Sequence, residues 1–431
     1  MLVERPIYLK KLIAKQNNGL IKIVTGLRRC GKSFLLLEIF CRYLRSVGIA
    51  DEQMIVLALD ELQNVKYRNP FELDKYLRSR IQHSNRQYYV FIDEIQKVQD
   101  VQNPWLKAED KIGFVDVLLG LMKFKNVDLY VTGSNSRLLS SDILTEFRGR
   151  GDEIRVAPLS YKEYCSAFPE NTRGLWKEYC RYGGMPYVLS LDGHEAKSGY
   201  LKDLFAKTYL TDVIEHNRIL NDKDKLEALL NVLSSAVGSL TNPAKLSRSF
   251  ASAAHENISP ATISRYIDYF ENAFLISKAQ RFDIKGKRYI GTPLKYYFTD
   301  TGLRNARLNF RQTEENHLME NIIYNELSVR GFDLDIGVIE QNYKGANGGA
   351  RQWLEIDFIA GRGDKRYYVQ SAFNIDDAEK KRQETRPLAK IPDAFKKIVV
   401  VKDDIIPGRD ENGVFYIGIE DFLLDENSMD L

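Results

Sequence analysis

One short motif near the N-terminus constrains the fold of this chain more than any other feature. Residues 26–33 read Gly-Leu-Arg-Arg-Cys-Gly-Lys-Ser and match the pattern G-x-x-x-x-G-K-[ST] without a mismatch. An apolar run at 20–25 precedes the motif, and an amphipathic helical pattern at 33–44 follows it. A glycine-rich turn between a strand and a helix cradles phosphates, because its N–H groups and the helix N-terminus face the anion. The motif therefore predicts a nucleotide-binding domain.

Each position of the motif has a physical role. Gly26 and Gly31 let the backbone curl around the phosphates. Lys32 places a positive charge near the β- and γ-phosphates, and Ser33 offers a hydroxyl to Mg²⁺. Cys30 is interpreted as a small filler, with a redox role as the alternative. We expect ATP and Mg²⁺ as cofactors, with nucleotide contacts from Gly26, Leu27, Arg28, Arg29, Cys30, Gly31, Lys32, Ser33 and Phe34.

Further apolar runs alternate with helical patterns through the first third of the chain, at 54–58, 88–92 and 127–132. Buried strands that alternate with helices are typical of a parallel sheet whose two faces are covered. The sequence therefore predicts an α/β fold with a parallel sheet of the P-loop NTPase type.

The run at 88–92 ends in two carboxylates, Asp93 and Glu94. We expect Asp93 to hold the Mg²⁺ that the Ser33 hydroxyl also binds, and Glu94 to orient and polarise the attacking water. A buried strand that ends in paired acids needs a cation to neutralise them. The pair favours hydrolysis over nucleotide binding alone; an ordinary strand end is the alternative.

Other polar residues are candidates for contacts to the γ-phosphate. Ser134 and Asn135 follow the run at 127–132 and can bind the phosphate or the attacking water; a helix-capping turn is the alternative. Arg148 and Arg150 can reach the γ-phosphate in cis or from a neighbouring subunit. Action from a neighbour would imply a homo-oligomer. The alternative is a pair of surface arginines near a helix C-terminus.

The later motifs resemble those of bacterial and archaeal AAA-type ATPases that carry a C-terminal domain of unknown function. That resemblance implies an AAA-like core at 1–157, a helical lid at 158–220, a winged helix at 221–310 and a restriction-endonuclease-like α/β domain at 311–431. The segments that carry the resemblance lie at 26–33, 91–96, 132–136, 149–150, 158–164 and 182–186.

The middle segment is basic, because residues 241–310 hold eleven Lys or Arg against five Asp or Glu. Ser259 is a candidate N-cap of a helix that has Pro260 at its first position. If this were a recognition helix, Thr262, Arg265 and Tyr266 would point outward. A basic hairpin is expected at 278–298, and its part at 281–296 would be the wing. Charged candidates for duplex DNA contacts are Arg265, Lys285, Lys287 and Arg288; a packing module or protein dock is the alternative.

Restriction-type nucleases need a metal-binding acid and an acid-x-Lys pair on neighbouring strands, often with an acid from a helix. Here Glu320 is the candidate helix acid and Asp357 the candidate strand acid. The next strand carries Gln370 and Ala372 where the acid and the lysine should stand. The sequence therefore predicts no nuclease activity, unless Lys365 swings in to supply the missing ammonium.

Composition narrows the remaining choices. The 431 residues have a formal net charge of +3, which hides the basic middle and an acidic end with two basic and nine acidic residues at 401–431. That end is interpreted as a solvated face or tail, with masking of the basic segment as the alternative. Four scattered cysteines exclude a disulfide framework. We expect no signal peptide, no membrane span and a cytoplasmic location.

Two function classes follow from these observations. The first is an ATP-hydrolysing switch or motor that acts on DNA or a protein. The alternative is an ATP-regulated DNA- or protein-binding module with negligible turnover. An ATP-gated nuclease is disfavoured by Gln370 and Ala372.

Overall fold

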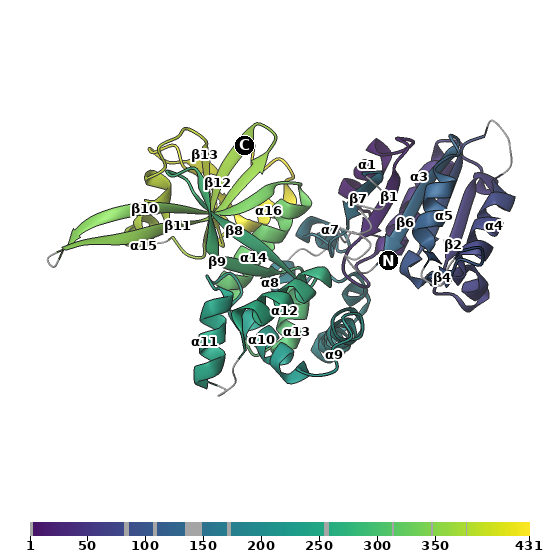
Figure 1. Cartoon of the computed structure of the whole chain (residues 1–431). Helices are drawn as coiled ribbons and strands as arrows, with labels where there is room; N and C mark the ends of the chain where they lie inside the picture. Colours follow the sequence, from purple (N-terminus) through teal and green to yellow (C-terminus); the bar gives the residue numbers. More distant parts are fainter. Residues whose placement is uncertain are drawn as a thin grey trace. The chain divides into compact units, whose positions relative to one another are not determined.

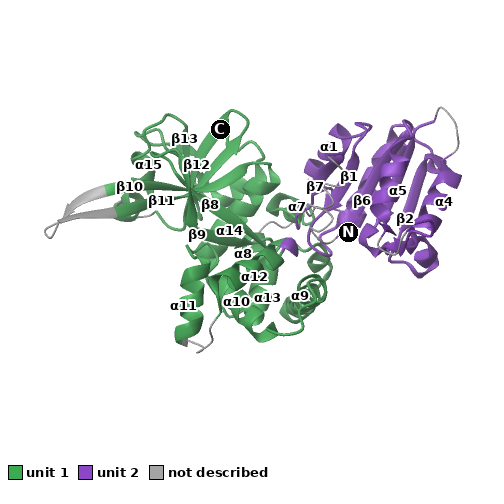
Figure 2. Ribbon diagram, viewed as in Figure 1, with its two compact units in different colours: residues 1, 159–271, 275–431 green, residues 2–158, 272–274 purple. Residues whose placement is uncertain are grey.

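The computed structural model of the chain describes residues 3–81, 86–106, 110–133, 149–169, 174–253, 258–312, 314–345, 348–375 and 377–431 (Figure 1). These residues form two compact units (Figure 2). Residues 2–158 with 272–274 make the N-terminal unit, and residues 159–271 with 275–431 make the C-terminal unit. The division into four domains at 157, 220 and 310 stays a prediction within this coarser arrangement.

The N-terminal unit is built on five parallel strands in the order β2-β3-β6-β1-β7. The four strands predicted from apolar runs are confirmed to within a residue or two. The fifth strand, β7, lies at the edge and has no counterpart among the predictions, because Asp152, Glu153 and Arg155 interrupt any apolar run. The strands are β1 (Ile21–Thr25), β2 (Met54–Ala58), β3 (Tyr88–Asp93), β6 (Val127–Gly133) and β7 (Gly151–Arg155).

Helices cover both faces of this sheet, as the parallel topology requires. On one face, Leu73 and Leu77 of α4 and Val117 and Leu118 of α5 join the buried core of the strands. On the other face, Phe40 packs edge-on against Phe91 at 6.1 Å between ring centroids. The helices are α1 (Pro6–Ala14), a continuous run of α2 (Lys32–Phe34), π-helical Leu35–Phe40 and α3 (Cys41–Ser46), then α4 (Pro70–Arg80) and α5 (Phe114–Leu121).

The C-terminal unit contains an eight-stranded mixed sheet in the order β14-β15-β13-β12-β11-β10-β8-β9. The antiparallel hairpin β8–β9 is the hairpin predicted at 278–298, and β8 pairs in parallel with β10. Segments expected in separate domains, before and after residue 310, thus share one sheet. The strands are β8 (Ile276–Asp283), β9 (Arg288–Phe298), β10 (Asp333–Gly345), β11 (Gly348–Arg362), β12 (Lys365–Ala372), β13 (Lys396–Val401), β14 (Gly408–Arg409) and β15 (Phe415–Gly418).

Two helices cover opposite faces of this sheet. Tyr324 of α14 (Glu315–Val329) stacks on Tyr297 at 4.3 Å between centroids. Leu388 of α15 (Ala378–Ala389) packs in a separate core with Ile356 and Tyr368. The remaining helices are α7 (Tyr161–Cys165), α8 (Leu175–Tyr182), α9 (Gly193–Thr208), α10 (Lys223–Ser235), α11 (Pro243–Ala253), α12 (Pro260–Asn272), α13 (Thr301–Arg307) and α16 (Ile419–Leu424).

The structure decides several local predictions in the middle segment. The Ser259 hydroxyl accepts a hydrogen bond from the Thr262 N–H at 3.1 Å, which confirms it as the N-cap of α12. The expectation that Tyr266 points outward is wrong, because its ring is 3% exposed and its hydroxyl donates to Asp222 at 3.1 Å. Helix α10 begins at Lys223, just inside the segment 221–310 that was expected to be a winged helix.

The acidic C-terminal end is a packed segment with a solvated face rather than a tail, because six of its nine acids are exposed. Ser428 and Met429 are buried, and the Arg330 guanidinium donates to the Ser428 hydroxyl at 2.8 Å and to the Phe422 carbonyl at 2.7 Å. Lys365 donates to the Asp430 carboxylate at 2.9 Å. The charges of this end therefore lie on a segment that is fastened to α14 and to β12.

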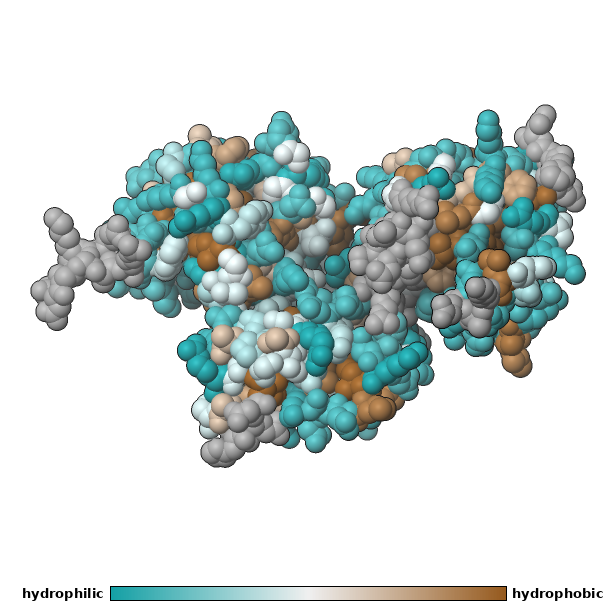
Figure 3. Space-filling model, in the orientation of Figure 1, coloured by the Kyte–Doolittle hydropathy of each residue, from teal (hydrophilic) through white to brown (hydrophobic). Residues whose placement is uncertain are grey.

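Two negative expectations concern the described residues. Within the ranges given above, no helix has both the length and the apolar character needed to cross a membrane. All four cysteines are free thiols, in agreement with the absence of a disulfide framework. On the face seen in Figure 3, hydrophobic residues of both units form separate patches among hydrophilic ones.

Candidate functional site

The phosphate-binding motif forms a curled loop between β1 and α2. Gly26 and Gly31 have φ angles of 140° and 100°, and Arg29 has a φ of 62°. These are left-handed or glycine-specific conformations, which turn successive N–H groups to one side. A side chain at Gly26 would place a Cβ 2.1 Å from the Val156 carbonyl oxygen. Glycine is therefore required at Gly26 for both conformational and steric reasons.

Lys32 is the first residue of α2, and its side chain folds back over the loop. Its ammonium donates to the carbonyl oxygens of Gly26 and Leu27, each at 3.0 Å. The residue is only 5% exposed. A buried ammonium that two carbonyl groups hold at the mouth of the loop has the position from which a lysine binds phosphate oxygens.

Ser33 and Asp93 come from different elements and meet at the carboxyl ends of β1 and β3. The Ser33 hydroxyl donates to the Asp93 carboxylate at 2.9 Å. The two residues predicted to share Mg²⁺ are thus brought together. An oxygen pair of one hydroxyl and one carboxylate fits Mg²⁺, which prefers one or two protein oxygens with waters and substrate phosphates as its other ligands.

Glu94 follows directly and adopts a left-handed conformation with a φ of 55°. Burial raises the pKa of its carboxyl, and the nearby Lys32 ammonium opposes that rise. The Gln96 side-chain amide donates to the Glu94 carboxylate. A carboxylate whose pKa is raised by burial is suited to general-base work near neutral pH.

Thr132 at the end of β6 connects the two carboxylate residues. Its hydroxyl donates to the Asp93 carboxylate and accepts a hydrogen bond from the Glu94 N–H at 2.9 Å. The sequence analysis missed this residue and named the polar residues just after the strand. The available signal was a hydroxyl residue at the end of the apolar run 127–132. Ser134, Asn135 and Arg148 lie outside the described residues.

The loop is anchored from outside the motif. Arg5 donates to the Cys30 carbonyl at 3.1 Å and to the Ala157 carbonyl at 2.8 Å. Cys30 is fully buried, with its Sγ 3.3 Å from the Val156 carbonyl oxygen. Burial favours the small-filler interpretation of Cys30 over a redox role. Of the other predicted contacts, Leu27 is buried, Arg28 is half-buried, and Arg29 and Phe34 are exposed.

Arg150 does not fit a role in cis. Its carbonyl accepts a hydrogen bond from the Ile21 N–H at 2.9 Å, which places it beside the amino end of β1. The phosphate-binding loop follows the carboxyl end of the same strand, about 16 Å away at the usual rise per residue. Contact with the γ-phosphate of a neighbouring subunit stays a prediction for Arg150.

The basic candidates for nucleic-acid contact lie on two elements of the C-terminal unit. Lys285, Lys287 and Arg288 are exposed at the turn of the β8–β9 hairpin. Arg265 lies exposed on α12, with its guanidinium carbon 5.9 Å from the centre of the Tyr266 ring. The three turn residues form a single cationic surface, to which Arg265 is not joined by any described contact.

The predicted acids of the C-terminal unit meet around a lysine that the sequence analysis did not consider. The Lys295 ammonium of β9 lies 2.8 Å from Glu320, 2.7 Å from Glu355 and 3.5 Å from Asp357. Burial raises the pKa of Asp357 to about 8, and Glu320 adds to the rise. Within the described ranges, no group of three or more His, Cys, Asp or Glu side chains is arranged to hold a metal ion.

The structure also places the residues where the nuclease motif fails. Ala372 is fully buried in the core under α15, and Gln370 accepts a long hydrogen bond from the Asp357 N–H at 3.4 Å. Lys365 pairs with Asp430 rather than with the acid cluster. The ammonium that lies among the acids comes from β9, not from β12. A lysine inside the apolar run 294–298 was the signal for a buried charge that needs partners.

Comparisons with known proteins agree with the site in the N-terminal unit. Residues 18–165 match a family described as "AAA domain", and residues 173–314 match a "Domain of unknown function (DUF8612)". An "Uncharacterized protein" of Haemophilus influenzae is 33% identical over 98% of this chain and 99% of its own length. "Uncharacterized protein MJ1544" of Methanocaldococcus jannaschii is 28% identical over 84% of this chain and 77% of its own length.

Similar solved structures include the Aeropyrum pernix ORC1 protein in complex with DNA, with a TM-score of 0.30 and 14% identity over 72% of this chain and 93% of that chain. Another is AMPPCP-bound DnaA from Aquifex aeolicus, with a TM-score of 0.31 and 13% identity over 61% of this chain and 85% of that chain. At these TM-scores the likeness carries no argument about function.

The N-terminal unit therefore contains an AAA domain of the P-loop type, a nucleotide-binding module on a parallel sheet. The chain as a whole belongs to the same family as the Haemophilus influenzae protein, since the two align over nearly their entire lengths.

Proposed function

We propose that the protein is an ATP hydrolase that works as a molecular switch or motor. The observation that carries this proposal is the 2.9 Å contact between the Ser33 hydroxyl and the Asp93 carboxylate, with Glu94 next in the chain. It joins the phosphate-binding loop to the acids of β3 in one site. Residues for binding the phosphates and for activating a water are then side by side.

In the proposed mechanism, Lys32 exchanges its bonds to the Gly26 and Leu27 carbonyl groups for bonds to phosphate oxygens. Ser33 and Asp93 would hold Mg²⁺, which supplies charge neutralisation for the transferred phosphoryl group. The loop N–H groups and the N-terminus of the helical run at Lys32 bind the remaining phosphate oxygens.

Glu94 has the role of orienting the attacking water and accepting its proton. The Thr132 hydroxyl accepts a hydrogen bond from the Glu94 N–H and so holds the Glu94 backbone in place. The position of the backbone in turn limits where the Glu94 carboxylate can lie. Gln96 holds the Glu94 carboxylate by its amide. Glu94 must exchange this bond for one to the water before it acts.

The test separates binding from turnover. We expect Lys32→Ala to abolish binding of a fluorescent ATP analogue and phosphate release together. We expect Glu94→Gln to keep nucleotide binding but to lower phosphate release by about 100-fold or more, because the amide is not a base. Direct titration and a phosphate-release assay measure the two quantities on the same preparations.

Lys123→Ala and Glu52→Gln are matched controls, since both residues are exposed in the N-terminal unit away from the loop. Both should release phosphate at the wild-type rate. Equal rates for wild type, Lys32→Ala and Glu94→Gln would contradict the proposal and leave the alternative of a binding module with negligible turnover.

The finer expectations belong to the same proposal. A winged helix at 221–310 would carry the response to duplex DNA or to a protein partner, and Arg148 or Arg150 would act from a neighbouring subunit of a homo-oligomer. A cytoplasmic location is part of it. ATPase turnover measured with and without duplex DNA at several protein concentrations tests partner and assembly together, because trans action makes the specific rate concentration-dependent.

The restriction-like C-terminal domain is proposed to lack nuclease activity. The Glu320, Glu355 and Asp357 carboxylates are engaged by the Lys295 ammonium, and β12 offers Gln370 in place of a further acid. Incubation of supercoiled DNA with Mg²⁺ or Mn²⁺ should leave it intact. Cleavage by the wild type that disappears in Asp357→Ala would show the prediction to be wrong.

A further inference from the structure

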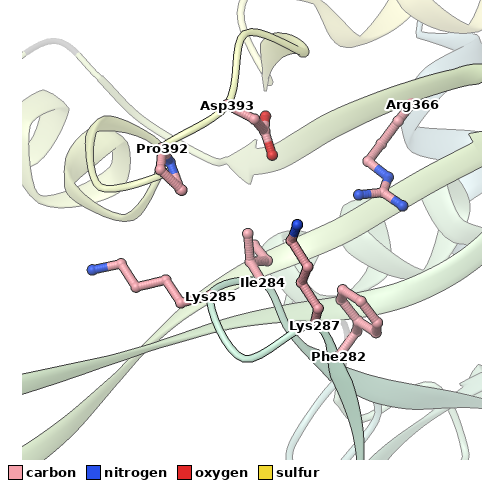
Figure 4. Close-up of a pocket in the computed structure, with 7 residues that line it drawn as sticks. All are labelled: Phe282, Ile284, Lys285, Lys287, Arg366, Pro392 and Asp393. Atoms are coloured by element: carbon pink, nitrogen blue, oxygen red, sulfur yellow. The ribbon is translucent and has the colours of Figure 1, made fainter.

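A pocket of about 600 Å³ lies within the C-terminal unit, beside the turn of the β8–β9 hairpin (Figure 4). Phe282, Ile284, Lys285 and Lys287 line it from the hairpin, and Arg366 lines it from the start of β12. The loop before β13 closes the remaining side. The site is separate from the nucleotide-binding loop, which belongs wholly to the N-terminal unit.

Three cationic side chains share this pocket. In Figure 4 the ends of Lys287 and Arg366 lie on one side of the pocket, near Asp393, and the end of Lys285 lies on the opposite side, away from both. None of the three cations forms an ion pair with a carboxylate of the described residues. Like charges gathered in one hollow repel one another, so an anion that binds between them is favoured.

The nearby carboxylates are occupied by other donors. Asp393 accepts from the Tyr368 hydroxyl at 2.6 Å and from the Phe395 N–H at 3.2 Å, one bond to each oxygen. Asp335 accepts from the Tyr289 hydroxyl at 3.1 Å. These bonds hold the two acids in place without removing their charges. The lining still holds three cations against the one carboxylate of Asp393, a net positive charge that favours an anion.

The hairpin turn that presents the two lysines is fixed. The buried Asp283 carboxylate accepts a hydrogen bond from the Gly286 N–H at 3.0 Å, and the Ile284 N–H donates to the Val338 carbonyl at 3.0 Å. Lys287 has a left-handed φ of 51°. A fixed turn lowers the entropy cost of gathering the cations around a ligand.

The floor of the pocket is apolar and partly aromatic. Phe282 and Ile284 supply it, and the exposed Tyr289 ring packs edge-on against Phe282 at 5.2 Å between centroids. Aromatic side chains at the edge of a cationic groove are platforms for stacking nucleic-acid bases. The cations suit the phosphate of a nucleotide, and the apolar, partly aromatic floor suits its base.

We infer that this pocket binds a nucleotide unit of a single-stranded nucleic acid. Lys285, Lys287 and Arg366 take the phosphate, and the base lies against Phe282 and Tyr289. A pocket of this volume is large enough for one nucleotide. This inference does not depend on ATP hydrolysis, and it differs from duplex contact by a wing, because it requires an unstacked base.

The test uses the full chain without ATP and a labelled single strand of about 12 nucleotides, within the usual site size of such proteins. Fluorescence anisotropy at several salt concentrations gives affinity and its salt dependence. Wild type should show a slope of about −0.7 in log affinity against log salt, from the one phosphate that the three cations neutralise. A duplex of the same sequence should bind at least about tenfold more weakly if one unstacked base is required.

Two variants separate the contribution of the phosphate contacts to binding from that of base stacking. Lys285→Gln with Lys287→Gln should weaken binding at least about tenfold and bring the slope closer to zero. Tyr289→Leu should weaken binding about tenfold with an unchanged slope, because it removes stacking and no charge. Lys202→Gln, an exposed lysine on α9, is the control for charge and should bind like wild type. Thermal melting shows that each variant is folded.

Competition identifies the source of the nucleotide. A nucleoside monophosphate and inorganic phosphate should displace the strand only at far higher concentration. If the monophosphate binds as tightly as the strand, the assignment to a strand is overturned in favour of a free nucleotide. If the lysine variant binds like Lys202→Gln, or if the duplex binds best and Tyr289→Leu has no effect, the inference fails. Lys32→Ala should bind the strand normally, which keeps this outcome separate from that of the ATPase test.

Discussion

Thr132 shows how one hydroxyl organises the nucleotide site. Its oxygen donates to Asp93 and accepts from the Glu94 N–H, so it relates the residue proposed for Mg²⁺ to the residue proposed for the water. Thr132 is 1% exposed. In a water-free position no solvent molecule can take over these two bonds. We assign it a positioning role.

Thr132→Val keeps the shape of the side chain and removes the hydroxyl. We expect kcat for ATP hydrolysis to fall by about 10- to 100-fold, because a misplaced reacting group costs rate far more than binding. KM should change by much less. Steady-state phosphate release over a range of ATP concentrations separates the two constants.

Thr132→Ser is the matched control, since it restores the hydroxyl without the methyl group. It should recover most of the lost kcat. A purely structural role would instead lower the thermal stability of Thr132→Val and leave the kcat of the folded protein unchanged, which would contradict the assignment.

Among single residues, the sequence predicted those site residues that belong to a short motif or to the end of an apolar run. Lys32, Ser33, Asp93 and Glu94 lie where a motif or a strand end placed them, and the structure brings Ser33 and Asp93 together as expected. Thr132 was within a predicted strand, but its role depends on β6 lying next to β3. Strand order is a tertiary property, so no local pattern reports it.

At the scale of elements, β9 has the largest effect that the sequence analysis did not anticipate. It carries Lys295 into the interior, where Glu320 of α14 and Glu355 and Asp357 of β11 surround it. The strand was read as part of a wing, so its lysine was not considered as a partner of the acids. Pairing of β8 with β10 turned the hairpin into the edge of the large sheet.

Lys295→Met should destabilise the C-terminal unit by about 3–5 kcal/mol, because it leaves buried carboxylates without their cation. Denaturant unfolding measures this change. Lys278→Met on β8 is the control: its ion pair with Glu271 is partly exposed and should contribute about 1 kcal/mol or less.

The same variant should show a pH dependence of known sign. Burial gives Asp357 a higher pKa in the folded protein, about 8, than a carboxyl has in the unfolded chain. The folded state then holds the proton more tightly, so stability falls as pH rises from about 4 toward 8. Lys295→Met should therefore lose more stability at pH 8 than at pH 5. An equal loss at both values would show that the carboxylates are not responsible.

The strands of the N-terminal unit were predictable because they are short apolar runs, and β7 was not because it lies at an edge with polar residues. The prediction that Tyr266 points outward was wrong, because the spacing of residues along a helix does not show which face of the helix packs against the rest of the protein. These two errors have one cause: burial is decided by neighbours that are distant in sequence.

At the scale of the whole molecule, the net charge of +3 is a sum of opposed regions. The acidic end was interpreted as a solvated face or tail. Most of its acids are exposed, as on a face, but Ser428 and Met429 are buried and Arg330 binds both Ser428 and the carbonyl of Phe422. Its residues therefore contribute to folding. Masking of the basic segment by a mobile acidic tail is not supported by this packing.

Deletion of residues 427–431 should lower the melting temperature by about 5 °C or more, because it exposes the Met429 contact and leaves Arg330 short of a partner. Differential scanning calorimetry measures the shift. Asp421→Asn, at an exposed acid on α16, should leave the melting temperature unchanged. A deletion that melts like wild type would restore the tail interpretation.

The buried lysine of β9 also determines where the positive charge among the three carboxylates comes from. A metal ion at the centre of three carboxylates comes from solution, and its occupancy follows the free concentration outside and the presence of chelators. The Lys295 ammonium is covalently part of the chain, so it is present in every molecule and does not depend on the ions in solution. The counter-ion of these carboxylates is therefore encoded in the sequence, with one in every molecule.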